Sequence, residues 1–183
     1  MKPWKTLSRH TILEHSKYLT VENHEIELPD GTIIPDWPWI ITPDFVNVIA
    51  VSYEGKFLCF RQTKYAIEGV TIAPVGGYIE DNEDPLVAAK RELLEETGYE
   101  ASQWIHLGSF CLMPNRNKAI GHSYLARDAK YVKPPDSDDL EEQELLLLDQ
   151  NELEKILLQG EIKVSSWANT VALALLRLKS KEG

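Results

Sequence analysis

Alternating apolar and polar positions predict strands in the first third of the chain. The segment YLTVENHEIEL, residues 18–28, is rich in β-branched residues and alternates loosely, and Pro29-Asp30-Gly31 after it is a strong turn signal. We therefore expect an N-terminal β-hairpin or meander. After the proline-interrupted piece TIIPDWPWIITPD, two apolar runs, FVNVIAVS and KFLCFRQ, flank a turn at residues 53–55. These two runs are predicted to be strands of the central sheet.

A helix from about Asp84 to Thr97 has the clearest boundaries in the chain. Asp84 can cap its first turn, Pro85 suits the first helical position, and Gly98 suits a left-handed exit. Apolar residues fall together on one side of this helix, which we expect to face the core: Leu86 with Leu93, and Val87 with Leu94.

The second half of the chain continues the mixture of strands and helices. The segments WIHLGSFCLM and HSYLARDAKYV are strand-like, and an acidic loop, DSDDLEEQE, precedes a short apolar strand, LLLL. Asp149 with Glu152 resembles a capping box for a helix that runs to Gly160, and a last helix is predicted from Ser165 to about Lys179. The pattern indicates a mixed α+β protein.

Composition fits a soluble globular chain. The 183 residues are 43% hydrophobic and 26% charged, and the first twenty lack the apolar segment of a secretion signal. The longest leucine run, residues 145–148, is far too short to cross a bilayer. We therefore expect a cytoplasmic protein without membrane contact. Cys59 and Cys111 both lie in apolar, strand-like stretches and are predicted to be reduced thiols of the core.

The charge balance limits the possible ligands. Asp and Glu number 29 against 19 Lys and Arg, a net charge of −10, which argues against nucleic-acid binding because that depends on basic residues that neutralise phosphates. An acidic site can still bind a polyphosphate when divalent cations lie between the two sets of negative charges.

Three glutamates, Glu92, Glu95 and Glu96, are placed at i, i+3 and i+4 on one face of the predicted helix. Their repulsion has two interpretations, a solvated acidic surface or a site for Mg²⁺ or Mn²⁺, since hard cations prefer carboxylate oxygens. Arg91 can pair with Glu95 at i+4 and orient it while the other carboxylates meet metal. Helix geometry alone does not choose between the two.

The larger pattern does choose. The spacing of these residues resembles the 23-residue signature of the Nudix hydrolases throughout, with Gly77, Glu83, Arg91-Glu92, Glu95-Glu96, Gly98 and the apolar Tyr99 in their places. The resemblance implies an α/β/α sandwich and cleavage, with a divalent cation such as Mg²⁺ or Mn²⁺, of a nucleoside diphosphate linked to another moiety. It further implies metal ligands at Glu92, Glu95, Glu96 and the carbonyl of Gly76.

Features outside the signature are similar to the ADP-ribose pyrophosphatase branch. Pro114 lies fifteen residues after Tyr99, and Arg61-Gln62-Thr63-Lys64 looks like the Arg-Gln-Tyr-Arg segment of that branch. The resemblance implies a homodimer, with an N-terminal extension at residues 1–42 and the Nudix domain at 43–183. It also implies aromatic residues that sandwich the adenine, and Tyr18 and Trp37 fall where those residues would be.

Further site residues follow from the same resemblance, for Arg61 and the catalytic base, and from the residues themselves, for Arg116 and His122. Arg61 is expected to contact the substrate, and Arg116 in the loop PNRNK either contacts phosphate or is a loop charge. The branch takes its catalytic base from a mobile acidic loop, here DSDDLEEQELL, with Glu142 or Glu144 favoured over Glu141. His122 is predicted to be a strand residue without a partner rather than a base.

Two departures from the branch leave the substrate open: Ala73 stands where glutamate is usual, and Asn115 follows Pro114 where glycine is usual. The first hypothesis is a pyrophosphatase for ADP-ribose or a related nucleoside diphosphate sugar. The second keeps the reaction but assigns a GDP-sugar, a dinucleoside polyphosphate or a damaged nucleoside triphosphate. The third is a non-catalytic module that binds a nucleotide.

Overall fold

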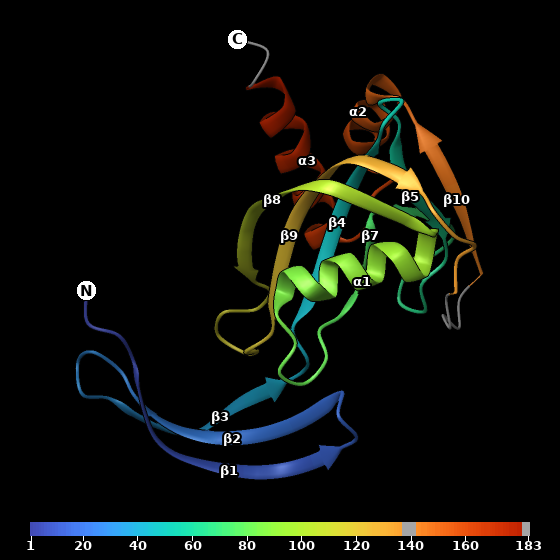
Figure 1. The fold of residues 1–183 in the computed structure, drawn as a ribbon. Coiled ribbons are helices and arrows are strands. Elements are labelled where there is room, and N and C mark those ends of the chain that lie inside the picture. The colour runs from blue at the N-terminus through green and yellow to red at the C-terminus, as the bar shows by residue number, and fades with distance from the viewer. Residues whose placement is uncertain (137–141, 181–183) are drawn as a thin grey trace. The chain divides into compact units, whose positions relative to one another are not determined.

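The computed structural model describes residues 1–136 and 142–180, and these form two compact units (Figure 1). The first unit contains Met1–Asp44 and Phe110–Ile120, and the second contains Phe45–Ser109 and the rest of the chain. The segment 110–120 therefore belongs with the N-terminal strands, although it lies far from them in sequence.

The first unit is built on a three-stranded antiparallel meander. Strands β1 (Lys5–His15), β2 (Leu19–Glu27) and β3 (Ile33–Ile41) lie in the order β1-β2-β3. The predicted turn after β2 is present, where the amide of Gly31 donates to the carbonyl of Leu28 at 2.9 Å. The proline-interrupted piece forms β3, in which Pro38 lies opposite Asn23, and the β2–β3 ladder has one register shift between His24 and Ile26.

The second unit has a seven-stranded mixed sheet. Its main path runs β10-β5-β4-β9-β8, with β6 beside β5 and β7 beside β4. β4 pairs in parallel with β9, whereas the pairs β4–β5, β4–β7, β5–β6 and β5–β10 are antiparallel. The strands are β4 (Phe45–Ser52), β5 (Phe57–Gln62), β6 (Thr71–Ala73), β7 (Val75–Tyr78), β8 (Tyr99–Cys111), β9 (Ile120–Tyr131) and β10 (Gln143–Leu148).

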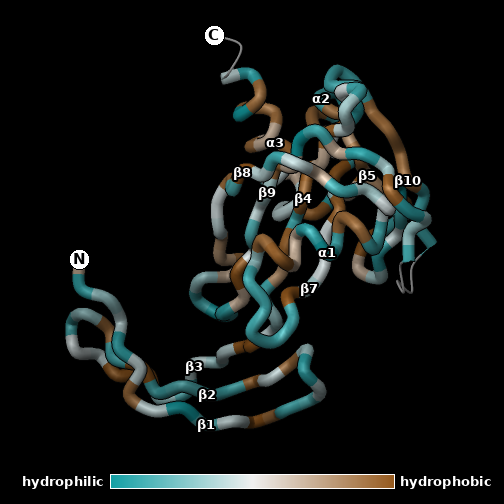
Figure 2. Tube along the Cα trace, in the orientation of Figure 1, coloured by the Kyte–Doolittle hydropathy of each residue, from teal (hydrophilic) through white to brown (hydrophobic). Residues whose placement is uncertain are grey.

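Helices cover both faces of this sheet, as an α/β/α sandwich requires. Helix α1 (Pro85–Thr97) packs on one face, and α2 (Gln150–Leu158) and α3 (Ser165–Lys179) pack on the other. The central strand β4 therefore buries both of its faces, with Val46 under α1 and Ile49 under α3. Figure 2 shows the hydrophobic positions of β4 and β10 in brown. The predicted α+β sandwich is confirmed.

The predicted helix boundaries are also confirmed. The Asp84 carboxylate accepts from the Leu86 amide at 2.9 Å, and Gly98 ends α1 in the left-handed region with φ 73°. Asp149 and Glu152 form the expected capping box of α2. None of the described helices is long and apolar enough to cross a bilayer.

Two predictions about burial are wrong in part. Val87 is 55% exposed, because α1 turns Ala88, Ala89 and Leu93 to the sheet instead. Both cysteines are free thiols, as predicted. Cys59 is buried in the core, and this burial raises the pKa of its thiol to about 12. Cys111, at the end of β8, is exposed and does not belong to the core.

Candidate active site

The carboxylate face of α1 lies against two glycines of β7. Gly77 pairs with Val46 on β4, and a Cβ atom at Gly77 would collide with the carboxylate of Glu92. A Cβ atom at Gly76 would collide with the carbonyl oxygen of Val46. Gly76 therefore cannot carry a side chain without a shift of the β4 backbone, and the absence of a side chain at Gly77 lets the Glu92 carboxylate approach the backbone of β7.

Arg91 organises the carboxylates around it. Its Nε and Nη2 donate to the two carboxylate oxygens of Glu83, both at 2.9 Å, and its Nη1 donates to Glu92 at 2.7 Å. The expected i,i+4 pair with Glu95 is present at 3.2 Å, and Nη2 also donates to the carbonyl of Tyr78 at 3.1 Å. The fork of one arginine thus fixes three carboxylates and the end of β7.

This cluster shifts the pKa values of its members. The hydrogen bonds from Arg91 hold the pKa of Glu83 below its ordinary value of 4.5, although partial burial opposes that shift. The hydrogen bond to Glu83 in turn raises the pKa of Arg91. The side chain of Glu83 is only 12% exposed, so water screens this pair weakly.

A pH-dependent contribution to stability follows from the lowered pKa of Glu83. Because the pKa of Glu83 is lower in the folded state than in the unfolded state, the ion pair stabilises the fold fully at pH values above the unfolded pKa. This stabilisation is lost as the pH falls through the folded pKa. At pH 7 we expect Glu83→Gln to lower the free energy of unfolding by about 1–3 kcal/mol. Denaturant unfolding of both proteins should show this gap closing below pH 4.5, the ordinary pKa.

The control for this prediction is Glu68→Gln, because Glu68 is exposed and outside the cluster. Its difference from the wild type should be small at every pH. A Glu83→Gln gap that stayed constant from pH 7 to pH 3 would contradict the assignment of the ion pair.

The donor set fits a hard divalent cation. Carboxylate oxygens project from one face of α1, and the backbone of β7 beside Glu92 has no side chains at Gly76 and Gly77. Among residues 1–136 and 142–180, no three acidic, histidine or cysteine side chains converge closely enough to hold a metal ion as they stand. Oxygens of Glu83, Glu92 and Glu95 point toward the Arg91 guanidinium instead.

The acidic segment after β9 begins beside α1. The amide of Asp136 donates to the carbonyl of Glu95 at 2.7 Å, and the amide of Val132 donates to that of Gly98 at 2.8 Å. Glu141 lies outside the described residues. Glu142 is exposed and directly precedes β10.

Glu144 lies on strand β10 rather than in a loop. It is opposite Arg61 on β5, and its Oε2 is 3.8 Å from the Arg61 Nη1. Arg61 alternates with Phe60, which packs under α1, so Arg61 and Glu144 point to the opposite face of the sheet. The structure therefore brings these two predicted site residues together, but on the face away from α1.

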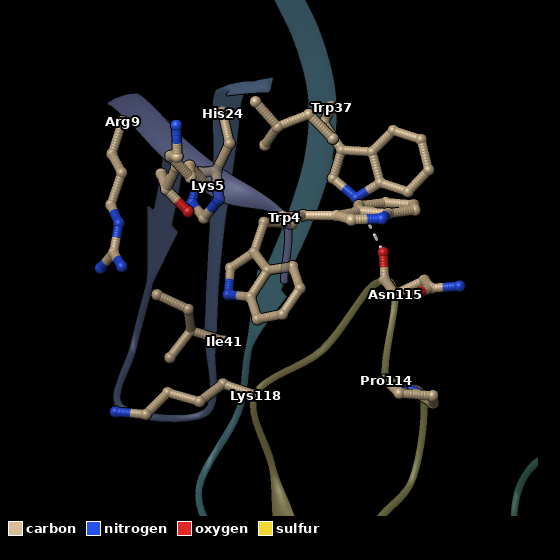
Figure 3. A pocket seen from close by; sticks show the side chains of 12 residues that line it. Trp4, Lys5, Arg9, His24, Trp37, Ile41, Pro114, Asn115 and Lys118 are labelled. Carbon is tan, nitrogen blue, oxygen red and sulfur yellow. Dashed lines mark hydrogen bonds between the residues drawn. The ribbon is translucent and has the colours of Figure 1, made fainter. Parts of the chain in front are cut away.

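The first unit brings together other predicted residues around Trp37. The indole Nε1 of Trp37 donates to the carbonyl of Asn115 at 2.9 Å, and the guanidinium of Arg116 lies 3.9 Å from the centroid of the Trp37 rings. Trp4 meets Trp37 edge-on at 5.5 Å (Figure 3). Tyr18 lies in the turn between β1 and β2, 48% exposed, and is not one of the residues around Trp37.

Trp37 is part of the lining of a cavity of about 640 Å³ within this unit. Aromatic and apolar side chains form its walls and basic groups accompany them, among them Trp4, Trp39, His24, Arg9 and Lys118 (Figure 3). An aromatic wall with nearby cations suits a flat base that carries phosphate.

Comparison with known proteins places this chain in a family. A model described as "NUDIX domain" matches residues 43–168, well over half of the chain. The chain belongs to the NUDIX family. A second model, "Nucleoside diphosphate sugar hydrolase N-terminal domain", matches residues 4–40 of this Nudix protein.

Three similar proteins of known name or structure can be compared with it. "Methanol dehydrogenase activator" of Bacillus methanolicus is 33% identical over 67% of this chain, and the match covers 65% of that protein, slightly less than two thirds. "ADP-ribose pyrophosphatase" of Bacillus subtilis (strain 168) is 29% identical over 96% of this chain and 93% of its own. A crystal structure of "ADP compounds hydrolase" superimposes with a TM-score of 0.81 at 18% identity, over 99% of this chain and 97% of that one, which confirms the fold.

Sequence reasoning missed several residues of the cavity in this Nudix protein. Trp4 is a single aromatic among charged neighbours, and Trp39 follows two prolines, so no periodic pattern connects them. His24 has no distinguishing signal in the strand pattern, but it is 4% exposed, stacks with Trp39 at 5.4 Å and lies 2.7 Å from the Glu22 carboxylate. The tryptophans separated by turn and proline signals were the one available clue.

Proposed function

We propose that this Nudix hydrolase cleaves the diphosphate linkage of ADP-ribose or a related nucleoside diphosphate sugar to a nucleoside monophosphate and a sugar phosphate. The observation that carries this proposal is the set of α1 carboxylates that Arg91 and the β7 glycines hold in place. The names of the Bacillus subtilis relative and of the structural neighbour support this class of substrate.

In the proposed mechanism, Glu92, Glu95, Glu96 and the carbonyl of Gly76 would hold Mg²⁺ or Mn²⁺. When bound, such a cation neutralises the diphosphate and stabilises charge on the departing phosphate. Arg91 acts as a positioning residue, because it binds Glu92 and Glu95 directly.

Water supplies the nucleophile in this mechanism, and a glutamate of the acidic segment accepts its proton as it attacks one phosphorus in line. The bond from that phosphorus to the bridging oxygen breaks, and the second phosphate leaves with the electron pair. The two predicted bases are Glu142, which is exposed and directly precedes β10, and Glu144, which points to the face away from α1.

We propose that the cavity at Trp37 binds the base, with the indole as a stacking surface and Arg116 near phosphate. The cation–π contact of Arg116 holds the guanidinium over the same ring. Tyr18 and Arg61 remain proposed substrate contacts from the resemblance to the branch. Their positions, on the β1–β2 turn and on β5, are both exposed.

Replacing Trp37 tests the base-binding proposal. Because stacking of a base on an aromatic ring is worth about 1–3 kcal/mol, Trp37→Ala should raise the KM for ADP-ribose by about tenfold or more, with kcat nearly unchanged. Trp37→Phe should recover most of the loss. Tyr65→Ala, at a fully exposed aromatic outside the cavity, is the control and should behave as the wild type. Equal KM values for Trp37→Ala and the wild type would contradict the role of the cavity.

We also propose that the protein is a homodimer. Strand β1 is exposed along its whole length and is an edge strand of the described meander. Trp4, Leu7, Ile12 and Leu13 are exposed on or beside it, and an apolar edge of this length is usually covered by another chain. Light scattering should report twice the mass of the chain, and a monomer at micromolar concentration would contradict this proposal.

A panel of nucleotide substrates tests the proposed function. Wild-type protein with Mg²⁺ is incubated with ADP-ribose, a GDP-sugar, a dinucleoside polyphosphate and an oxidised nucleoside triphosphate, and the products are separated by anion exchange. Release of AMP from ADP-ribose in clear preference to the others supports the proposal. Preference for another member would reassign the substrate, and no turnover of any member would leave a non-catalytic binding module.

A further inference from the structure

Three polar side chains, His106, Ser109 and His122, form a hydrogen-bonded cluster on the sheet of the second unit. The Ser109 hydroxyl lies 3.0 Å from His106 Nε2 and 2.9 Å from His122 Nδ1, and the two imidazole centroids are 6.5 Å apart. The expectation that His122 lacks a partner is therefore wrong. His106 and Ser109 are exposed and His122 is half-buried, so the cluster is open to solvent.

A break in the regular strand brings these residues together. His106 and Ser109 are three residues apart on β8, and residues at that spacing on a regular strand point to opposite faces. Gly108 between them has φ 147°, a conformation that L side chains rarely adopt. The irregular backbone at Gly108 turns Ser109 toward the imidazole of His106.

The cluster lies on the same face of the sheet as the α1 carboxylates. His122 on β9 pairs with Val46 on β4, and Val46 pairs with Gly77 on β7, so the three form one row across the sheet. Val46 is buried under α1, and a Cβ atom at Gly77 would meet Glu92. Since neighbouring strands are about 4.8 Å apart, the backbones of His122 and Gly77 are separated by about 10 Å.

We propose that this cluster binds the sugar attached to the second phosphate of the substrate, an inference that rests on the proposed function. A diphosphate held at the α1 carboxylates directs one of its two substituents along this face of the sheet, where the row reaches His122 on β9 and β8 follows with His106 and Ser109. A hydroxyl and two imidazoles can each donate or accept, which suits the hydroxyl groups of a sugar. Ser109 is the central member, because both imidazoles bond to its oxygen.

Two ligands that differ only in the terminal sugar test this proposal. In one assay with Mg²⁺, we would measure the KM for ADP-ribose and the Ki of ADP, which lacks the terminal ribose, as a competitive inhibitor. Ser109→Ala and the double variant His106→Asn/His122→Asn should raise the KM for ADP-ribose by about fivefold to tenfold, the value of one or two hydrogen bonds. The Ki of ADP should change by less than twofold and kcat by less than threefold.

Ser102→Ala is the matched control, since Ser102 is an exposed serine on the same strand, outside the cluster. It should leave both constants unchanged, and melting temperatures verify that all variants fold. An unchanged KM for ADP-ribose, or an equal rise in KM and Ki, would overturn the proposal. If the wild-type protein turns over none of the nucleotides in the panel, the proposed function itself fails. If it turns over ADP-ribose but the variants show no difference between KM and Ki, only the sugar-binding proposal fails.

Discussion

Replacing Glu95 or Glu96 by glutamine is expected to lower kcat by about three orders of magnitude. Each carboxylate would supply negative oxygen ligands to the cation, and a metal's stabilisation of transition-state charge is worth several kcal/mol, about tenfold for every 1.4 kcal/mol. Glutamine keeps the size of the side chain and removes its charge, so the fold should persist. Initial rates of AMP release from ADP-ribose with Mg²⁺ measure the effect.

The matched control is Glu100→Gln. Glu100 is exposed on the strand that follows α1 and lies outside the carboxylate cluster, so its replacement should leave kcat within about twofold of the wild type. Circular dichroism of the three variants should show the same helix content. Near-normal activity of either Glu95→Gln or Glu96→Gln would mean that the metal assignment is wrong.

Gly98→Ala is expected to lower the free energy of unfolding by about 3 kcal/mol or more. Gly98 ends α1 with φ 73°, and a Cβ atom there would collide with the backbone carbonyl oxygen of Lys133. Backbone cannot move aside as a side chain can, because the amides of Val132 and Lys133 both donate to the carbonyl of Gly98. Urea unfolding of the variant and the wild type measures the loss.

Gly160→Ala separates the two causes of this loss. Gly160 has the same φ of 73°, but a Cβ atom there would have nothing within 4 Å. Its replacement should therefore cost only the strain of a left-handed alanine, about 1 kcal/mol. Similar losses for the two variants would show that the contact with Lys133 does not matter.

Gly98→Ala should also slow turnover, because the segment from Val132 to Asp136, which bonds to Gly98 and Glu95, leads to the acidic residues.

The parts of this molecule that follow from local rules could be predicted from the sequence. The ends of α1 depend on Asp84 and Gly98, which act on the backbone within one helical turn. The spacing of Glu92, Glu95 and Glu96 determines a shared helix face before any tertiary contact is known. Helical spacing did not predict the exposure of Val87, because α1 packs closely on the sheet through the small side chains of residues 88 and 89.

The parts that depend on distant segments could not be predicted. The cavity at Trp37 needs Trp4 from the N-terminus and the loop at Asn115. Asn115, which accepts the hydrogen bond of Trp37, is 78 residues away in sequence. The opposite orientation of Glu144 follows from its register against Arg61, and an acidic loop carries no register signal. The cluster at Ser109 needs the unusual φ of Gly108, and a single glycine in a strand does not specify which face its neighbour takes.

The most direct test of the central claim is a metal titration of ADP-ribose hydrolysis. Protein dialysed against a chelator is mixed with ADP-ribose, Mg²⁺ is added in steps, and AMP and ribose 5-phosphate are quantified by chromatography. The account predicts that both products appear in equal amounts only when Mg²⁺ is present, and that Glu96→Gln forms almost none at the same concentrations. Equal rates with and without the chelator, or no AMP at any concentration of Mg²⁺ or Mn²⁺, would contradict it.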